Sequence, residues 1–251
     1  MGKITEQRIE RAAAGPRGGK KLMRLLTWNC CRGAFAKKAP FLEPLAADIA
    51  VIQECGKPES ESDTCLWFGD NPKQGIAVVA KNGYRLRALP AIADVPKFVF
   101  PVEVTGPETF LLLVVWSKGK QKFRYVMGVV KAIETYKPLI QSVTTVVMGD
   151  LNSNAIWDSW HPKHLNHSAL IAALAELGLV SSYHSFFDEA QGAETRPICY
   201  LLWKKERPYH IDYCFLPQAW LPRLRSVQVG TYDAWSQHSD HRPLLVDIST
   251  I

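Results

Sequence analysis

Polar residues stand at points where runs of apolar residues end, and these positions carry the side chains best suited to chemistry. Asn29 follows LLTW, and Glu54 follows IAVIQ. Asp150 and Asn152 come after TVVM and a glycine. An ionised carboxylate beside a buried run is costly unless it is paired or binds a cation. Each position taken singly also fits an ordinary loop or turn residue.

Two later segments repeat this pattern. Asp212 lies within the apolar run HIDYCFL, and Asp240 with His241 directly precedes PLLVDI. Strand ends that gather on one edge of a sheet are where open α/β architectures place their ligands. Because five segments end in the same way, we expect their polar side chains to meet in one site.

The types of these residues limit the chemistry of that site. Amide and carboxylate oxygens without cysteine suit a hard cation, Mg²⁺ or Mn²⁺, better than zinc. Mg²⁺ keeps several waters, which leaves room for a substrate phosphate. An aspartate can orient a histidine that donates to a phosphate oxygen, and another can position or deprotonate a water. The set therefore predicts in-line phosphoryl transfer.

The elements that must position these residues are short apolar runs alternating with amphipathic stretches. We expect strands at residues 24–28, 49–53, 75–80, 98–104, 109–116, 144–148, 210–216 and 243–248. We expect helices at 39–47, 127–140 and 167–177, the last capped by Asn166 and Gly178. Pro44 disfavours the first of these helices. Many strands and few helices predict an α/β (α+β) fold in which two sheets pack together with helices outside.

Composition places the chain among ordinary globular proteins. Of its 251 residues, 47% are hydrophobic and 22% are charged. No apolar run approaches the roughly 18 to 20 residues that span a bilayer. The six cysteines show no CxxC pairing, and several lie in strand-like runs. We therefore expect a cytoplasmic protein with reduced cysteines and no membrane span.

The formal net charge of +6 belongs mainly to one end of the chain. Residues 1–24 hold seven basic and two acidic residues, a net of +5, which leaves about +1 for residues 25–251. Residues 1–22, rich in small and basic residues, are interpreted as a flexible extension, and residues 23–251 as a single domain. A nearly neutral domain would steer an anionic polymer only weakly.

The ordered motifs of the chain resemble a known superfamily. TWN at 27–29, IQE at 52–54, GDLNS at 149–153, HIDY at 210–213 and SDHRP at 239–243 are similar to the motifs of the endonuclease/exonuclease/phosphatase superfamily. The resemblance extends over residues 23–248. It implies a four-layer sandwich, with two packed mixed β-sheets flanked by helices, and an enzyme that depends on Mg²⁺ or Mn²⁺.

The resemblance also implies metal ligands. Glu54 corresponds to the principal ligand, with Asn29 beside the metal and the phosphate. Asp240 would complete the acidic cluster near the metal.

The same motifs imply four catalytic residues. Asp150 would align or activate the attacking water, and Asn152 would hydrogen-bond the phosphoryl oxygens. His241 would contact the scissile phosphate, oriented by Asp212.

One position departs from the family pattern. Many members carry a histidine or tyrosine that touches the phosphate after the central strand, where this chain reads VVWSKG. Trp116 or Ser117 occupies that neighbourhood, so Trp116 is a candidate apolar or stacking wall as well as a candidate core residue. The alternating Lys118, Lys120, Lys122 and Arg124 fit a phosphate track or, more simply, a solvated hairpin.

Two further clusters have competing interpretations. The aromatic and basic segment before HIDY holds candidate substrate contacts at Trp203, Lys204 and Arg207. His161 and His167, with a third histidine between them, are expected to be solvated rather than to bind zinc, because their spacing would fan them round a helix.

The sequence thus favours a metal-dependent phosphodiesterase acting on nucleic acid, with a monomer as the default state. A phosphatase or phosphodiesterase for a small or lipid-derived ester stays open as the alternative. A catalytically silent module that binds a phosphorylated partner is a second alternative, although such a module would have no need of the carboxylates.

Overall fold

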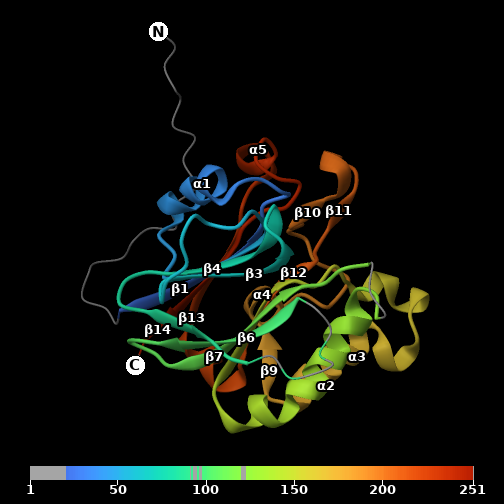
Figure 1. The fold of residues 1–251 in the computed structure, drawn as a ribbon. Coiled ribbons are helices and arrows are strands. Elements are labelled where there is room, and N and C mark those ends of the chain that lie inside the picture. Colours follow the sequence, from blue (N-terminus) through green and yellow to red (C-terminus); the bar gives the residue numbers. More distant parts are fainter. Residues whose placement is uncertain (1–20, 91, 93–94, 96–97, 120–122, 251) are drawn as a thin grey trace.

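Two mixed β-sheets pack face to face, with helices on their outer faces (Figure 1). The computed structural model describes residues 21–250 except residues 91, 93, 94, 96, 97 and 120–122. The proposed extension of residues 1–22 lies outside the described residues apart from its last two. The first strand already begins at Leu22.

The first sheet holds the two motifs nearest the N-terminus. Its strand order is β13-β14-β1-β2-β4-β3. The strands are β1 (Leu22–Asn29), β2 (Ile49–Cys55), β3 (Cys65–Asn71), β4 (Gln74–Ala80), β13 (Leu224–Val229) and β14 (Leu244–Ser249). β1 runs parallel to β2 and antiparallel to β14 at the centre of the sheet.

The second sheet holds the GDLNS and HIDY motifs. Its strand order is β5-β6-β7-β8-β12-β9. The strands are β5 (Arg85–Ala88), β6 (Val99–Thr105), β7 (Phe110–Trp116), β8 (Thr145–Asp150), β9 (Leu179–Ser181) and β12 (Asp212–Pro217). A separate pair, β10 (Cys199–Tyr200) and β11 (Pro208–Tyr209), forms a small hairpin.

Helices cover both outer faces and complete four layers. The α-helices are α1 (Phe35–Lys38), α2 (Val126–Ser142), α3 (His167–Glu176), α4 (Ser182–Phe187) and α5 (Tyr232–Trp235). The 3₁₀ helices are η1 (Ala39–Leu45), η2 (Ala155–Trp160), η3 (Lys163–Leu165), η4 (Leu201–Trp203) and η5 (Gln218–Arg223). The α2 and α3 helices pack on the second sheet, and η1 and α5 pack on the first.

The period of two along a strand explains how one strand serves two cores. In β1, Met23 and Leu25 face the core between the sheets, whereas Leu26 and Trp28 face the layer of η1 and α5. Strands buried on both faces read as continuous apolar runs, which is why the sequence pattern identified them.

The predicted fold class is confirmed, and each predicted strand has a counterpart. The prediction missed the exposed or short strands, which are β3, β5, β9, β10, β11 and β13. The helix expected at 39–47 is a 3₁₀ turn over Ala39–Leu45, because Pro44 lies inside it and cannot donate an α-helical hydrogen bond. Within the described residues, none of the helices has both the length and the apolar character needed to span a bilayer.

Candidate active site

The register of the second sheet aligns three candidate residues in a row. Trp116 at the end of β7 pairs with Asp150 at the end of β8, and Asp150 pairs with Asp212 at the start of β12. Direct cross-strand partners point to the same face of a sheet. This face is the one that meets the first sheet, because Trp116 belongs to the core between the sheets.

Asn29 reaches the same place from the first sheet. It ends β1 on the inward phase shared with Met23 and Leu25, so its side chain faces the second sheet. Its Nδ2 donates to Asp150 Oδ2 at 2.9 Å and to Glu54 Oε1 at 3.3 Å. Asn29 therefore bridges the carboxylates of the two sheets.

A backbone irregularity turns Glu54 toward this bridge. Strict alternation along β2 would point Glu54 outward with Ile52, but the register with β4 shifts between Gln53 and Cys55. Glu54 takes a left-handed conformation with φ of 59°. A bulge of this kind re-aims a side chain, at a cost in backbone strain. Gln74 Nε2 then donates to Glu54 Oε2 at 3.0 Å.

The GDLNS motif forms a tight loop at the end of β8. Gly149 has φ of 147°, and a Cβ there would lie 1.9 Å from the Val115 carbonyl oxygen, so only glycine fits. Asn152 is also left-handed, with φ of 46°. Its backbone N–H donates to Asp150 Oδ1 at 2.8 Å, and its Nδ2 donates to Asp150 Oδ2 and to the Ser117 carbonyl oxygen. The loop thus holds the Asp150 carboxylate in one orientation.

Asp212 and His241 form a buried pair. His241 Nδ1 lies 2.7 Å from Asp212 Oδ2, and the Asp212 side chain is fully buried. The backbone around His241 is held from several sides. Ser239 Oγ accepts from the His241 N–H and donates to the Asn29 carbonyl, while Trp28 Nε1 donates to the His241 carbonyl. Ser239 therefore ties the SDHRP motif to the end of β1.

Arg242 supports this loop from behind, a role that the sequence reasoning did not assign. Its side chain is fully buried and donates from Nη1 to the carbonyls of Ser239 and His241. The guanidinium lies over the rings of Tyr200 and Tyr232, 4.8 and 4.9 Å from their centroids. The only sequence signal for this role was its place inside SDHRP.

The electrostatics of the cluster indicate a place for a cation. Burial and the neighbouring Asp212 carboxylate raise the pKa of Asp150. Burial opposes the charge on His241, but the Asp212 carboxylate overcomes it and raises the pKa of His241 well above its usual value. Asp212 Oδ1 is buried and has no hydrogen-bond partner among the described residues. Buried carboxylates with unused lone pairs are suited to a bound cation.

The predicted site residues form a hydrogen-bonded chain and a buried pair, and Asp240 lies beside the pair. Asn29, Glu54, Asp150 and Asn152 form one hydrogen-bonded chain. The ligand atoms of Asp150, Asp212 and His241 lie within 4.8 Å of one another, which joins the pair to that chain. Asp240 lies among Cys31, Cys199 and His241, and its charge, like that of Glu54, acts on Asp212.

The departure at the end of β7 brings in a residue that the sequence reasoning did not select. Trp116 is only 3% exposed and packs edge-on against Phe98. The Lys118 ammonium lies over both rings, 3.5 Å from the Trp116 centroid and 3.7 Å from that of Phe98. The hairpin interpretation for Lys118 is therefore wrong, because its side chain returns to the site, where Glu54 interacts with its charge. Lys120 and Lys122 lie outside the described residues.

The other candidate substrate contacts lie on the β10–β11 hairpin. An isolated antiparallel β-bridge between Cys199 and His241 attaches this hairpin beside the site. Trp203 at its tip is 47% exposed and has φ of 59°, unusual for a large side chain. Lys204 and Arg207 are exposed on the same arm.

A polar network behind the GDLNS loop was also missed. Asn154 Nδ2 donates to both oxygens of Glu194 at 3.1 Å and to the His210 carbonyl at 3.0 Å. His184 Nε2 lies 3.0 Å from Glu194 Oε1. The expectation that His167 is solvated is wrong: it is 1% exposed and its ring bonds Ser153 and Gln191.

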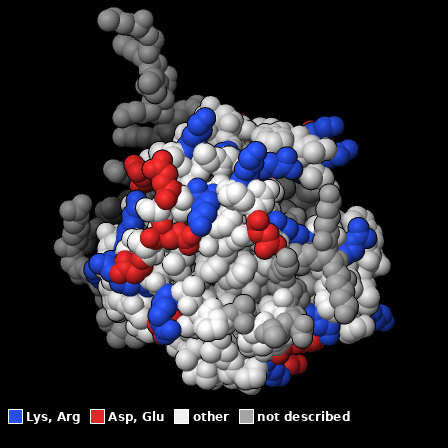
Figure 2. Space-filling view, in the orientation of Figure 1, with Lys and Arg blue, Asp and Glu red and all other residues white. Residues whose placement is uncertain are grey.

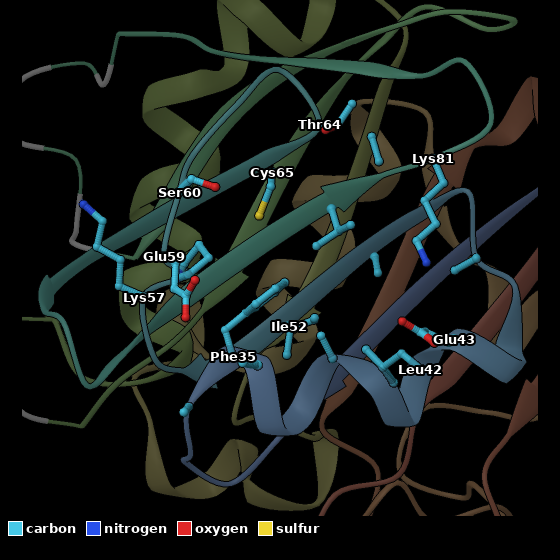
Figure 3. Close-up of a pocket in the computed structure, with 18 residues that line it drawn as sticks. Phe35, Leu42, Glu43, Ile52, Lys57, Glu59, Ser60, Thr64, Cys65 and Lys81 are labelled. Atoms are coloured by element: carbon cyan, nitrogen blue, oxygen red, sulfur yellow. The ribbon is translucent and has the colours of Figure 1, made fainter.

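Two hollows flank the first sheet. One, of about 560 Å³, adjoins Glu54 through Gln74 and is lined by Arg32, Lys57 and Lys73. The other, of about 660 Å³, lies between α1–η1 and the outer face of the sheet and contains none of the predicted site residues (Figure 3). On the face seen in Figure 2, basic and acidic side chains are interspersed, so no single sign of charge dominates it.

Solved structures of other proteins share this architecture, although the sequence itself has no match. No family model matches the sequence, and neither does any curated protein. A 3′ phosphatase from Neisseria, solved with a product DNA hairpin, superposes with a TM-score of 0.68 at 20% identity and covers 90% of this chain and 99% of its own. The endonuclease domain of a telomere-specific non-LTR retrotransposon gives 0.65 at 19% identity, covering 92% of this chain and 99% of that chain.

A third solved structure comes from an archaeon. The AP endonuclease of Archaeoglobus fulgidus gives a TM-score of 0.66 at 14% identity and covers 89% of this chain and 98% of its own. These superpositions extend over nearly complete chains, so they show a shared fold even though the sequence identity is low. The chain therefore has the fold of the endonuclease/exonuclease/phosphatase superfamily, as its ordered motifs predicted.

Proposed function

We propose that this protein is a Mg²⁺- or Mn²⁺-dependent hydrolase that cleaves a phosphodiester bond in nucleic acid by in-line attack of water. The observation that carries the proposal is the meeting of Asp150, Asp212 and His241 in one buried cluster that Asn29 bridges to Glu54. A module that only bound an anion would not bury carboxylates there.

The pair Asp212 and His241 would stabilise the reacting phosphate. The Asp212 carboxylate holds the His241 ring by Nδ1 and favours its protonated form. The remaining N–H at Nε2 is then a charged donor for a phosphoryl oxygen. The pair acts as a fixed cationic donor, not as a titrating base.

Asp150 would align the attacking water and accept its proton. Three N–H groups from Asn29 and Asn152 fix the orientation of its carboxylate. Both N–H groups of the Asn152 amide contact protein acceptors in this arrangement, so it would bind a phosphoryl oxygen only after exchanging one of them.

The residues present fit a hard divalent cation. Glu54 offers a partly exposed carboxylate, and the buried Asp212 Oδ1 has no partner among the described residues. Glu54, Asn29 and Asp240 would hold the ion, which when bound would polarise a phosphoryl oxygen and neutralise charge in the transition state.

Lys118 would supply a second contact to the phosphate at the position where Trp116 departs from the family pattern. Its ammonium rests on two aromatic rings at the cluster, interacts with Glu54, and forms no ion pair among the described residues. Lys118→Met should lower kcat/KM by about 10- to 100-fold, as expected for removal of a charged contact to a phosphate. Lys118→Arg should retain most of the activity.

Nucleic acid is the favoured substrate because an extended ligand has surfaces to follow. The hollow beside Glu54 carries Arg32, Lys57 and Lys73, which suit a phosphate backbone. Trp203, Lys204 and Arg207 form an exposed arm on the hairpin that Cys199 bridges to His241. The similar solved structures include a protein bound to a DNA hairpin.

The test uses purified protein with Mg²⁺ or Mn²⁺ on plasmid, abasic duplex, single-stranded oligonucleotide, a 3′-phosphorylated hairpin, bis-p-nitrophenyl phosphate and simple monoesters. Metal-dependent cleavage of a nucleic acid, lost in Glu54→Gln, is the expected result. Turnover of small monoesters with nucleic acid left intact would contradict the substrate, and inactivity on every compound would contradict the enzyme.

The setting of the protein is part of the proposal. All six cysteines are free, which supports a reducing, cytoplasmic compartment. We also propose a single catalytic domain over residues 23–251 and a monomer as its working state. Size-exclusion chromatography with light scattering would test the monomer.

A further inference from the structure

A second cluster of metal-binding side chains adjoins the proposed active site. The ligand atoms of Cys199, Asp240 and His241 lie within 4.8 Å of one another. The Cys31 thiol lies beside the Asp240 carboxylate, and the Cys199 thiol lies beside the His241 ring. One thiol, an imidazole and a carboxylate therefore converge on one point, and the Cys31 thiol adjoins them at Asp240.

Three separate segments build this cluster, so it is not an accident of local spacing. Cys31 follows β1 in a turn with φ of 50°, and its backbone N–H donates to Asn29 Oδ1. Cys199 belongs to β10 and is bridged to His241 backbone to backbone. The Tyr200 N–H donates to the Asp240 carbonyl at 2.7 Å, which fixes that loop against the hairpin.

We propose that Cys31, Cys199, Asp240 and His241 form a binding site for a thiophilic divalent cation, Zn²⁺ above all, that inhibits the enzyme. Two sulfurs, one nitrogen and one oxygen are a ligand set for tetrahedral zinc, whereas Mg²⁺ takes oxygen ligands and rarely a thiolate. The thiols and the imidazole thus favour Zn²⁺ over Mg²⁺, and Asp240 is the one residue that the two proposed sites share.

The geometry supports entry and coordination. Cys199 and His241 are buried at the base of the cluster, while Cys31 and Asp240 are half-buried at its opening. Zinc ligands are separated by about 3.5 Å in a tetrahedral site, given bond lengths of about 2.0 to 2.3 Å. The ligand atoms of Cys199, Asp240 and His241, within 4.8 Å of one another, are near that spacing, and the Cys31 side chain would turn from Asp240 to supply the fourth ligand. Binding would release thiol and imidazolium protons to solvent.

Inhibition follows from the nitrogen that the cation would use. His241 Nδ1 is held by Asp212, so Nε2 is the nitrogen free to bind a metal. A cation on Nε2 displaces the proton that the proposed mechanism donates to the phosphate. The inhibition therefore rests on the proposed function, but the metal binding does not.

Cobalt(II) provides a direct test of the binding. Titration of the metal-free protein with Co²⁺ should produce the thiolate-to-cobalt charge-transfer band and the visible bands of tetrahedral Co²⁺, and Zn²⁺ should abolish both. Cys199→Ser should remove the charge-transfer intensity that its sulfur provides and weaken Co²⁺ binding by at least about 10-fold, the usual minimum for disturbing a metal site. Cys31→Ser should reduce the intensity of the charge-transfer band by the part that the Cys31 sulfur contributes.

Cys65→Ser is the matched control, because Cys65 is also half-buried but lines the cavity outside the first sheet. It should leave the spectrum unchanged. Absence of a charge-transfer band in the wild-type protein, or an unchanged band in Cys199→Ser, would overturn the site. Both outcomes are read without any substrate, so they are independent of the proposed activity.

The inhibition is measured separately as the ratio of rates with and without equimolar Zn²⁺ at saturating Mg²⁺, each variant normalised to its own rate. The wild type and Cys65→Ser should lose at least about 10-fold, and a chelator should restore the rate. Cys199→Ser should lose less than about twofold. Equal inhibition of Cys199→Ser would show that Zn²⁺ acts elsewhere.

Discussion

Two buried acidic regions lie on either side of the GDLNS loop, and they are built in opposite ways. At the site, burial and a neighbouring carboxylate raise the pKa of Asp150, and Asp212 Oδ1 has no partner among the described residues. Behind the loop, Glu194 is also buried, but hydrogen bonds from His184, Gly192 and Asn154 lower its pKa to about 2.

The difference separates a functional region from a structural one. The Glu194 network satisfies its own charge and needs no ligand, so it can hold the loop in place. The Asp150–Asp212 cluster leaves charge and lone pairs unsatisfied, which costs stability unless a cation and a phosphate complete it. If replacing an acid had the same effect on stability and on metal binding in both regions, this distinction would fail.

The largest expected effect is catalytic. Asp212→Asn should lower kcat by about 10³-fold or more, because the amide no longer holds His241 in its charged form and orientation. The rate is measured on the substrate identified above, with circular dichroism and melting temperature as checks of folding. A loss below tenfold in a folded variant would refute the assigned role of the pair.

Replacing one acid in each region tests the comparison most directly. Glu194→Gln should lower the free energy of unfolding at pH 7 by up to about 3 kcal/mol, from a pKa lowered by roughly 2.5 units at 1.36 kcal/mol per unit. It should keep the stabilisation by Mn²⁺, which is about 2.7 kcal/mol at a hundred times the Kd.

Asp150→Asn should show the reverse in the same denaturation experiment. Its stabilisation by Mn²⁺ should be lost, because the variant removes a negative charge that Asn29 bridges to Glu54, the principal proposed ligand. If Mn²⁺ stabilises Asp150→Asn as strongly as the wild type, the cation binds elsewhere and the contrast between the two regions fails.

The pH dependence of stability provides the third test. Burial lowers the pKa of His210 to about 4, beside the Glu194 network. As the pH falls below about 6.5, His210 takes up a proton in the unfolded chain but stays neutral in the folded protein until about pH 4. The free energy of unfolding therefore declines across this window by about 3 kcal/mol.

His210→Phe is the control for this window, because it keeps an aromatic ring among Tyr183 and Tyr213 and cannot titrate. The free energy of unfolding of this variant, measured in urea, should change less between pH 6.5 and 4 than that of the wild type. Below pH 4.5, protonation of Glu194 in the unfolded chain should still reduce stability in both proteins. Equal slopes above pH 4.5 would show that His210 is not the titrating group.

The smallest expected effect concerns the exposed arm. Trp203→Ala should raise KM for a nucleic acid by about fivefold, since a base stacked on an aromatic ring contributes about 1 kcal/mol or more. Turnover of bis-p-nitrophenyl phosphate should not change, because that compound is too small to reach the arm. Phe186→Ala, which removes a similarly exposed ring from α4, is the control. Equal effects of the two variants would exclude a contact through Trp203.

Much of the fold and of the site was predictable, because the information was local. Asn29, Asp150 and Asp212 end or begin apolar runs, and the ends of paired strands must meet. Gly149 was recognisable within its motif, and its need for φ of 147° explains why no other residue serves there. The confirmed strands are those buried on both faces, where the apolar pattern is strongest.

The rest depended on contacts between distant segments. The spacing of His161 and His167 suggested solvated residues, whereas His167 is buried because Ser153 and Gln191 come to its ring. Lys118 was interpreted as one charge of a hairpin, and only the packing of Phe98 beside Trp116 makes a seat for its ammonium. No local pattern encodes either contact.

The sequence by itself determined which residue types stand at the strand ends, and hence a hard-cation phosphate chemistry. Tertiary structure decided which of them act together: the bulge that turns Glu54 inward, the register that sets Asp150 opposite Asp212, and the bridge that brings Cys199 to His241. Residue identity is a property of one position, whereas a site requires several positions to converge. That convergence is fixed by the packing of one sheet on the other.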